Sequence, residues 1–229
     1  MPVLLITGAS TGIGATTARH AVEAGWKVAL GARSEDKLEA LVGELGEDNA
    51  FAKACDVTEL GDQDAFVGAA IERFGQVDAA FANAGFGAAR GFLKEDPDKW
   101  RQMVLTNVLG VAYTIRAVMP HFQERNQGHF LLTSSVAGRR ALPGSLYSST
   151  KWAVTGMGEA LRQELRQQEG SQVRVSLIEP GVVDTPFFDN RPSSALEPDD
   201  IARVVMFVLE QPAHVDINEV LIRPTSQAG

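Results

Sequence analysis

Tyr147 and Lys151 stand four residues apart in a segment with helical periodicity, so their side chains lie on one face of a helix. An ammonium group beside a phenol favours the phenolate, because an opposite charge stabilises the ionised form. A free tyrosine titrates near pH ~10, too high for acid–base catalysis at neutrality, and we expect the lysine to lower that pKa. Ser135, twelve residues before Tyr147, offers a hydroxyl to the same substrate oxygen. Taken alone, such a pair is more often a solvated helix face, and the interpretation as a proton-transfer site depends on what the rest of the chain builds around it.

The scaffold for these side chains is indicated by short apolar runs that alternate with amphipathic segments. Strands are expected at 3–7, 27–30, 50–54, 77–82, 129–133, 173–178 and 217–222. Helices are expected at 12–24, 35–45, 59–74, 98–124, 145–169 and 199–210. Pro120 is expected to bend or break the fourth helix near its end.

Strands that are apolar throughout are buried on both faces, and strand–helix alternation predicts a parallel sheet. The sequence thus predicts an α/β fold, a doubly wound Rossmann-type sheet of seven mostly parallel strands with helices on both faces. Ligands are expected at the carboxyl ends of the strands. We expect residues 1–229 to form a single domain with a short substrate loop at about 182–198.

Composition narrows the classes of partner. The 229 residues are 45% apolar and 22% charged and carry a net charge of −8. No Lys/Arg cluster exceeds a pair, which argues against nucleic acid and membrane partners. Cys55 is the single cysteine and the four histidines are scattered, so neither a disulfide nor a metal site is expected. We see no signal peptide and no apolar run near transmembrane length, and expect a cytoplasmic protein.

A glycine-rich loop follows the first strand directly. Its glycines, Gly8, Gly12 and Gly14, allow a sharp turn and a close approach to a pyrophosphate, whose charge the next helix N-terminus stabilises. A purely structural turn is the alternative. The place of the loop after a chain-opening buried strand favours a dinucleotide site.

Taken together, these motifs resemble the short-chain dehydrogenase/reductase family of the classical type, over essentially the whole chain. The resemblance is carried by the loop 7–14, Asp56–Val57, Asn83–Ala84–Gly85, Asn107, Ser135, Tyr147 with Lys151, and Pro180–Gly181. It implies a catalytic tetrad of Asn107, Ser135, Tyr147 and Lys151. In that tetrad Tyr147 exchanges the proton and Ser135 orients the carbonyl. Lys151 also bonds the nicotinamide ribose, and Asn107 holds a water that links Lys151 to solvent.

Cofactor contacts follow partly from the residues and partly from the resemblance. They are expected at Gly8, Ser10, Thr11, Gly12, Ile13, Gly14, Arg33, Ser34, Asp56, Val57, Asn83, Ala84, Gly85, Tyr147, Lys151, Pro180, Gly181, Val183 and Thr185. Without the family, Asp56 is interpreted as a turn residue and 83–85 as a strand-to-loop turn. Ser134 competes with Ser135 for the catalytic serine.

The end of the second strand indicates which dinucleotide binds. A carboxylate there would bond the adenine ribose 2′-hydroxyl, whereas an arginine binds a 2′-phosphate. The chain has Ala32, Arg33 and Ser34 at this point, and a guanidinium binds phosphate bidentately. We therefore expect NADP(H), with NAD(H) as an alternative. Arg33 could instead pair with Glu35 or Asp36.

The substrate side is predicted to be mostly apolar. It is expected to include Phe86, Pro143, Phe187, Phe188 and Arg191. Arg139, Arg140 and Arg191 could hold a substrate carboxylate, although surface ion pairs are the commoner role of such arginines. The segments 196–202 and 217–225 are similar to reductases that act on 3-hydroxy acids such as serine.

We predict an NADP(H)-dependent oxidoreductase that interconverts a carbonyl and a secondary alcohol, acting on 3-hydroxy acids or on a broad range of carbonyl compounds. The alternative is a catalytically idle NADP(H)-binding redox sensor. A sugar-nucleotide epimerase of the extended type would need a further substrate domain. The family resemblance implies a homodimer or homotetramer.

Overall fold

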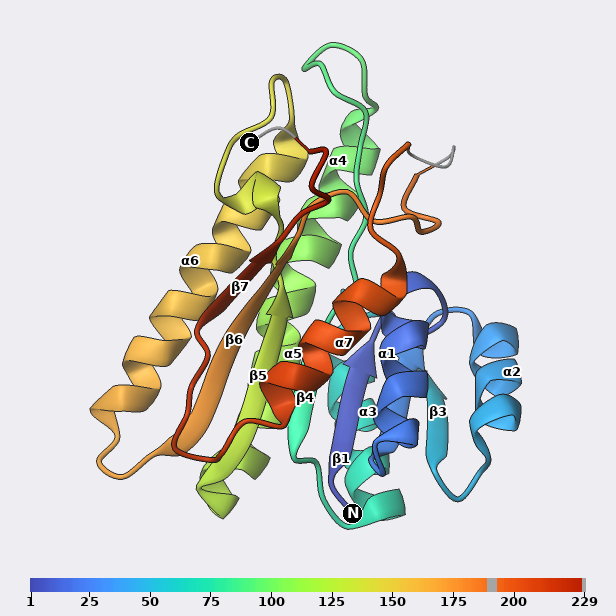
Figure 1. Ribbon diagram of the computed structural model, residues 1–229, viewed down its shortest axis with the longest axis vertical. Helices are drawn as coiled ribbons and strands as arrows, with labels where there is room; N and C mark the ends of the chain where they lie inside the picture. The colour runs from blue at the N-terminus through green and yellow to red at the C-terminus, as the bar shows by residue number, and fades with distance from the viewer. Residues whose placement is uncertain (189–192, 228–229) are drawn as a thin grey trace.

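The computed structural model describes residues 1–188 and 193–227, and Arg191, which is predicted to border the substrate, lies outside them. Its centre is a seven-stranded sheet in the order β3-β2-β1-β4-β5-β6-β7 (Figure 1). Every adjacent pair is parallel. The strands are β1 (Val3–Thr7), β2 (Lys27–Ala32), β3 (Ala50–Ala54), β4 (Ala79–Ala82), β5 (Gln127–Thr133), β6 (Gln172–Pro180) and β7 (Glu219–Ile222). The order reverses between β1 and β4, the point at which doubly wound sheets bind ligands.

Helices cover both faces of the sheet, as the alternation predicts. One face packs against α1 (Gly12–Glu23), α2 (Glu35–Leu45) and α7 (Pro198–Leu209). The other packs against α3 (Leu60–Phe74), α5 (Gly110–Arg125) and α6 (Leu146–Gln167). Among the largest fully buried side chains are Phe66, Phe81, Phe122 and Phe130. Each such ring stabilises the fold by about 1.5–3 kcal/mol, so the predicted α/β fold rests on two apolar layers.

The predicted helix 98–124 differs from the structure. It consists of α4 (Pro97–Val104), a π-helical turn (Leu105–Leu109) and α5. Pro120 does not end it, since α5 continues to Arg125. Phe122, beyond the proline, is fully buried against Phe130 with ring centroids 4.8 Å apart. This packing holds the last turn in place despite the missing backbone donor.

No apolar run near transmembrane length is expected from the sequence, and the stretch Pro97–Arg125 shows that this expectation is wrong. Among the described residues, this 29-residue helix is long and apolar enough to cross a membrane by length and composition alone, with a hydropathy of 1.3. Core helices of soluble proteins pass the same test, and Val111, Val118 and Phe122 pack into the core under the sheet. We therefore describe it as a core helix of the fold.

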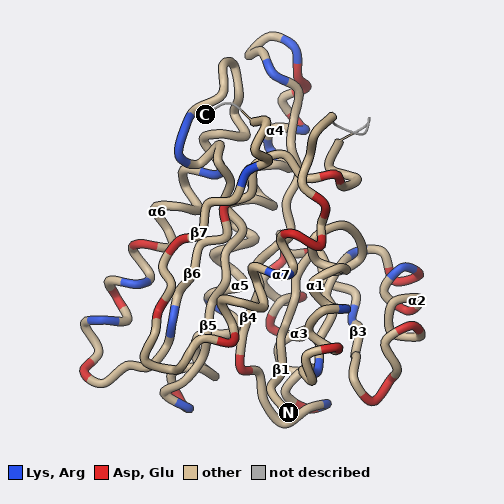
Figure 2. The backbone as a smooth tube through the Cα atoms, in the orientation of Figure 1, with Lys and Arg blue, Asp and Glu red and all other residues tan. Residues whose placement is uncertain are grey.

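Charged residues are dispersed over the chain. Figure 2 shows Lys and Arg interspersed with Asp and Glu along most elements, without a long basic stretch. Acidic residues outnumber basic ones by 29 to 21, which gives the net charge of −8.

Candidate active site

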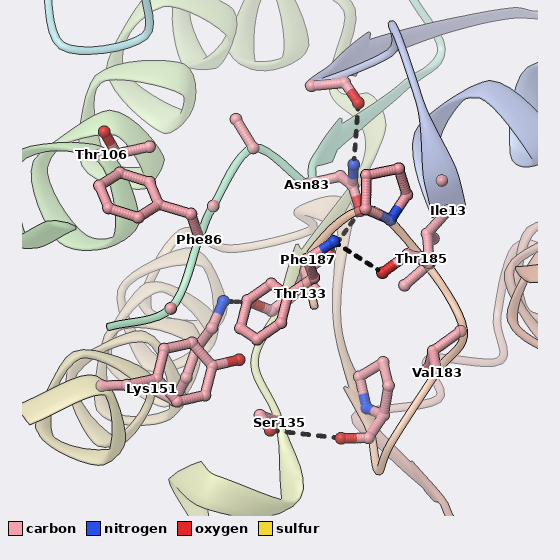
Figure 3. Close-up of a pocket in the computed structure, with 18 of the residues that line it drawn as sticks. Ile13, Asn83, Phe86, Thr106, Thr133, Ser135, Lys151, Val183, Thr185 and Phe187 are labelled. Atoms are coloured by element: carbon pink, nitrogen blue, oxygen red, sulfur yellow. Dashed lines mark hydrogen bonds between the residues drawn. The ribbon is translucent and has the colours of Figure 1, made fainter. Parts of the chain in front are cut away.

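A pocket of about 550 Å³ opens at the carboxyl ends of the strands. Most of the predicted site residues line it. Figure 3 labels ten of the lining residues, of which Thr106 and Thr133 were not predicted. The predicted residues in its wall are Gly8, Ser10, Thr11, Gly12, Ile13, Arg33, Ser34, Asp56, Val57, Asn83, Ala84, Gly85, Phe86, Ser135, Tyr147, Lys151, Pro180, Gly181, Val183, Thr185, Phe187 and Phe188. Gly14, Asn107 and Pro143 are outside the wall.

The glycine loop has the shape that a phosphate group needs. Gly8 and Gly12 have φ values of +66° and +54°, which L side chains rarely adopt. A Cβ on Gly14 would lie 2.4 Å from the Gly8 carbonyl oxygen, so Gly14 allows α1 to approach the loop. The side chain of Thr11, the N-cap residue of α1, makes no capping bond. The N–H groups and dipole of α1 therefore suit a pyrophosphate.

Asn83 joins the ends of the central strands. Its backbone N–H donates to Thr7 Oγ1 over 3.1 Å, and its side-chain amide donates to the carbonyls of Thr7 and Gly8 over 3.3 Å. The Thr133 hydroxyl, on β5, donates to Asn83 Oδ1 over 3.4 Å. These bonds link β1, β4 and β5 beside the pocket. Asn83 therefore holds together the part of the pocket wall against which a cofactor would lie.

The far end of the pocket is bordered by β2 and by the loop after β3. Arg33 is exposed there and, within the described part of the chain, forms no ion pair with Glu35 or Asp36. Ser34 precedes α2, and its hydroxyl makes no capping bond. Asp56 has the turn role that its sequence suggests, because Asp56 Oδ1 accepts bonds from both the N–H and the hydroxyl of Thr58. It lines the pocket as well.

Tyr147 and Lys151 lie in the first turns of α6, which Ser145 caps by accepting a bond from the Ser148 N–H. Lys151 Nζ lies 5.6 Å from the centre of the Tyr147 ring and donates to the Thr133 carbonyl over 2.8 Å (Figure 3). Burial lowers the pKa of Lys151 to about 8. Tyr147 and Lys151 are thus placed on one face and directed into the pocket.

The pKa of Tyr147 departs from the sequence-based expectation of a lowered value. Burial raises the pKa of the phenol to about 12, and the Ser135 hydroxyl offsets part of this rise. Burial dominates because desolvation disfavours the phenolate, while the nearby lysine already donates to the Thr133 carbonyl. At neutral pH the phenol therefore holds its proton and can act as a donor.

The two candidate serines have different surroundings. Ser135 Oγ donates to the Pro180 carbonyl over 3.3 Å (Figure 3) and accepts from the Ala137 N–H over 3.1 Å. Ser134 Oγ is bonded to α6, through the Lys151 carbonyl and the Thr155 hydroxyl. The hydroxyl near Tyr147 is that of Ser135, which hydrogen-bonds the phenol and so acts to lower its pKa.

Asn107 is fully buried in the π-helical turn. Its amide nitrogen donates to the Phe86 carbonyl over 2.9 Å and to Thr150 Oγ1 over 3.1 Å. Its Oδ1 accepts from the Phe86 N–H over 3.0 Å. A π-helical turn adds one residue to a helix and often marks a functional site. Here it turns Asn107 toward the Phe86 segment and Lys151, and a Cβ on Gly85 would meet both side chains.

The substrate end contains residues that the sequence did not indicate. They are Arg90, Thr106, Leu142, Ser145 and Gln227. Leu142 and Ser145 stand in the wall in place of the exposed Pro143. Contacts between distant loops hold the Arg90 loop and Gln227, whereas Thr106 lies in the π-helical turn, and no local sequence pattern indicates these positions.

Aromatic side chains border the catalytic group. Phe187 lies edge-on to Tyr147 with ring centroids 5.4 Å apart, and its ring also packs against Gly87. Gln227 Oε1 accepts a bond from the Val182 N–H over 3.0 Å. The start of the loop after β6 is thus held by a residue near the end of the chain.

Arg139 and Arg140, two of the three arginines considered for binding a substrate carboxylate, do not lie in the pocket wall. Arg139 forms ion pairs with Glu179 at 2.8 Å and with Glu219 at 2.5 Å. Burial raises the pKa of Glu179, and Arg139 counteracts that rise. Arg140 is exposed and outside the pocket wall. The ion-pair alternative therefore holds for Arg139.

Comparison with known proteins agrees with this geometry. A family model described as short chain dehydrogenase matches residues 2–195. An uncharacterized oxidoreductase of Listeria monocytogenes is 41% identical, over 98% of this chain and 97% of its own length. An alcohol dehydrogenase from the archaeon Thermococcus sibiricus, solved with 5-hydroxy-NADP, is 33% identical over 100% of this chain and 99% of its own, with a TM-score of 0.91.

Two further solved structures differ in cofactor. A closed form of serine dehydrogenase complexed with NADP+ is 31% identical over 99% of this chain and 96% of its own, with a TM-score of 0.91. A short-chain dehydrogenase/reductase from Burkholderia phymatum in complex with NAD is 26% identical over 96% and 88%, with a TM-score of 0.87. The chain therefore belongs to the short-chain dehydrogenase family and is an NAD(P)-dependent dehydrogenase or reductase.

Proposed function

We propose that the protein interconverts a carbonyl compound and a secondary alcohol with NADP(H), and that Tyr147 is its general acid and base. One observation carries the proposal. Tyr147, Lys151 and Ser135 converge on the wall of a pocket whose other end is the glycine loop at the N-terminus of α1. The pocket thus joins a proton donor to a dinucleotide site.

The cofactor, when bound, supplies or takes up the hydride. The Ser135 hydroxyl holds the substrate oxygen, and the neutral Tyr147 phenol donates its proton to that oxygen as the hydride reaches the carbon. Oxidation of the alcohol reverses both transfers. Lys151, with its pKa lowered to about 8 by burial, places a positive charge beside the phenolate that forms and so stabilises it.

We propose that Asn107 positions the segments around the catalytic residues Tyr147 and Lys151. Its three hydrogen bonds fix the Phe86 backbone and Thr150, and Asn107 Oδ1 and Lys151 Nζ border the same space at Gly85. Asn107 Oδ1 has a second lone pair. It can therefore support the water-mediated proton path from Lys151 that the family resemblance implies.

The NADP(H) preference rests on Arg33 and Ser34. Within the described residues Arg33 forms no ion pair and Ser34 makes no capping bond, and both follow Ala32, the last residue of β2, where an NAD-type site would have a carboxylate. The 2′-phosphate of NADP(H) could bind the Arg33 guanidinium through two bonds and accept a third from the Ser34 hydroxyl. NAD(H) has no 2′-phosphate and would gain neither interaction.

A substrate panel separates an enzyme from the alternative, an idle redox sensor. The absorbance of NADPH is followed with ketones, diketones and 3-oxo acids. Turnover of at least one class, dependent on protein concentration, is expected. Tight NADPH binding without turnover across the panel would instead favour the sensor.

We also propose that the protein forms a homodimer or homotetramer. Val104, Leu109 and Trp152 are large apolar side chains left exposed on neighbouring helices, with 38%, 38% and 49% of their surface accessible. Association would bury them. Light scattering of the purified protein gives the number of subunits directly.

A further inference from the structure

The cations on the pocket wall divide it into three regions. Among the described residues that line it, the cations are Arg33, Lys151 and Arg90, and the acid is Asp56. Arg33 and Asp56 lie at the end next to β2 and β3, and Lys151 is in the middle. Arg90 belongs to the loop between β4 and α4, at the substrate end. That end therefore has a positive charge and no carboxylate in its described wall.

The Arg90 loop is fixed while the guanidinium stays unpaired. The Gly91 N–H donates to the Gly144 carbonyl over 2.8 Å, which joins this loop to the one before α6. Glu95 accepts bonds from the N–H groups of Ala89 and Asp96 and pairs with Lys99 at 3.3 Å. The nearest acid in the sequence is therefore already engaged, and the Arg90 guanidinium has no ion pair or hydrogen bond within the part of the chain that the structure describes.

Arg90 is also only three residues along the chain from Gly87, which lies beside the catalytic group. The Phe187 ring packs on Gly87 and lies edge-on to Tyr147. Arg90 follows Gly87 by three residues, which span at most about 10 Å when extended. Its long side chain can therefore reach a group a few bonds away from the carbonyl that Tyr147 protonates.

We propose that Arg90 binds the carboxylate of the substrate, so that the substrate is a short hydroxy acid or oxo acid. A guanidinium holds a carboxylate through two parallel charge-assisted bonds, which fixes orientation as well as affinity. Such a bond would aim the carbinol or carbonyl carbon at Tyr147. Arg139 is unsuited to this task because Glu179 and Glu219 neutralise it. The proposal rests on the proposed function and adds to it the chemical class of the substrate.

The test compares two substrates that differ in charge. 3-Hydroxybutyrate and methyl 3-hydroxybutyrate are oxidised with NADP+, each as both enantiomers, by the wild type, Arg90→Met, Arg90→Lys and Arg140→Met. Arg140 is the matched control, because it is exposed as Arg90 is but lies outside the pocket wall. For Arg90→Met we expect the acid-to-ester ratio of kcat/KM to fall about 10- to 100-fold, the loss of one or two charge-assisted bonds. The loss should be in KM for the acid, Arg90→Lys should recover part of it, and Arg140→Met should match the wild type.

Three outcomes would overturn the proposal or the function beneath it, and they are distinguishable. An equal ratio for the wild type and Arg90→Met, with the ester turned over normally, would refute the role of Arg90 alone. A wild type that turns over neither compound nor any other ketone or alcohol would refute the proposed function. A third arm uses a 3-oxoacyl thioester of phosphopantetheine. If Arg90→Met impairs this thioester but not the acid, the guanidinium binds a phosphate and the carboxylate assignment is wrong.

Discussion

His129 should make the protein unusually sensitive to mild acid. Its side chain is on β5, 2% exposed, with Nε2 2.8 Å from Ser176 Oγ. Ser176 donates its own proton to the Ile217 carbonyl, so His129 Nε2 carries the hydrogen and Nδ1 is unprotonated. Nδ1 has no hydrogen-bond partner within the described residues. Burial, assisted by the charge of Arg174, lowers the pKa of His129 to about 3.

The sign of the effect follows from linkage. A histidine in the unfolded chain takes up a proton near pH ~6.5, whereas His129 in the folded state takes one up only near pH 3. Between these values the unfolded state binds the extra proton, so the free energy of unfolding decreases as the pH falls. The slope is about 1.4 kcal/mol per pH unit below pH ~6.5, which amounts to about 2 kcal/mol at pH 5 relative to pH 7.5.

Urea unfolding at pH 7.5 and pH 5.0 measures this loss in the wild type and in His129→Gln, which keeps a side-chain donor for Ser176. Subtracting the variant removes the contribution of the carboxylates and the other histidines. The wild type should lose about 2 kcal/mol more than the variant. His214→Gln, at an exposed position, should behave like the wild type. Equal losses in the wild type and His129→Gln would show that His129 is protonated in the folded state.

Substitutions at four further positions test individual contacts of the site. Arg33→Asp should raise the KM for NADPH about 10- to 100-fold, as expected for lost charge-assisted bonds, and leave NADH much less affected; steady-state kinetics with both cofactors would contradict the assignment if both suffered equally. Ser135→Ala should reduce kcat about 100-fold, whereas Ser134→Ala should mainly lower the free energy of unfolding by about 1–3 kcal/mol, and the reverse pattern would exchange their roles. Gln227→Ala should raise the KM of a neutral ketone about fivefold by releasing the Val182 N–H, while Gln227→Glu, which keeps the acceptor, should stay near the wild type; matching losses would mean that the bond to the loop is unimportant.

The sheet and the dinucleotide end of the site were predictable because they depend on local patterns. The uninterrupted apolar runs, such as Val3–Thr7, form buried parallel strands as expected. A parallel sheet brings the carboxyl ends of its strands to one edge. The glycine loop and Asn83 therefore meet in the pocket although β1 and β4 are far apart in sequence.

The substrate end was not predictable in the same way. Arg90 enters the wall because Gly91 bonds to Gly144, and Gln227 because it bonds to Val182. These contacts join loops separated by about fifty residues, and no periodicity encodes them. The π-helical turn at Asn107 was not predictable either. We attribute it to the two hydrogen bonds between the Asn107 side chain and the Phe86 backbone, which join separate segments of the chain.

The electrostatics of the site also needed the structure. The sequence places Lys151 beside Tyr147 and so predicts a lowered phenol pKa. In the fold both groups are buried, which raises the pKa of Tyr147 to about 12 and lowers that of Lys151 to about 8. Burial depends on what packs over α6, and spacing along one helix does not reveal it.

The central claim, proton transfer by Tyr147, is tested most directly by Tyr147→Phe, which removes one hydroxyl and keeps the ring that packs on Phe187. The measurement is kcat for reduction, with the Kd of NADPH determined on the same sample by fluorescence titration. The predicted result is a fall in kcat of about 10²- to 10⁴-fold with a Kd close to that of the wild type. A variant that retains more than about a tenth of the wild-type kcat, well above that range, would contradict the account.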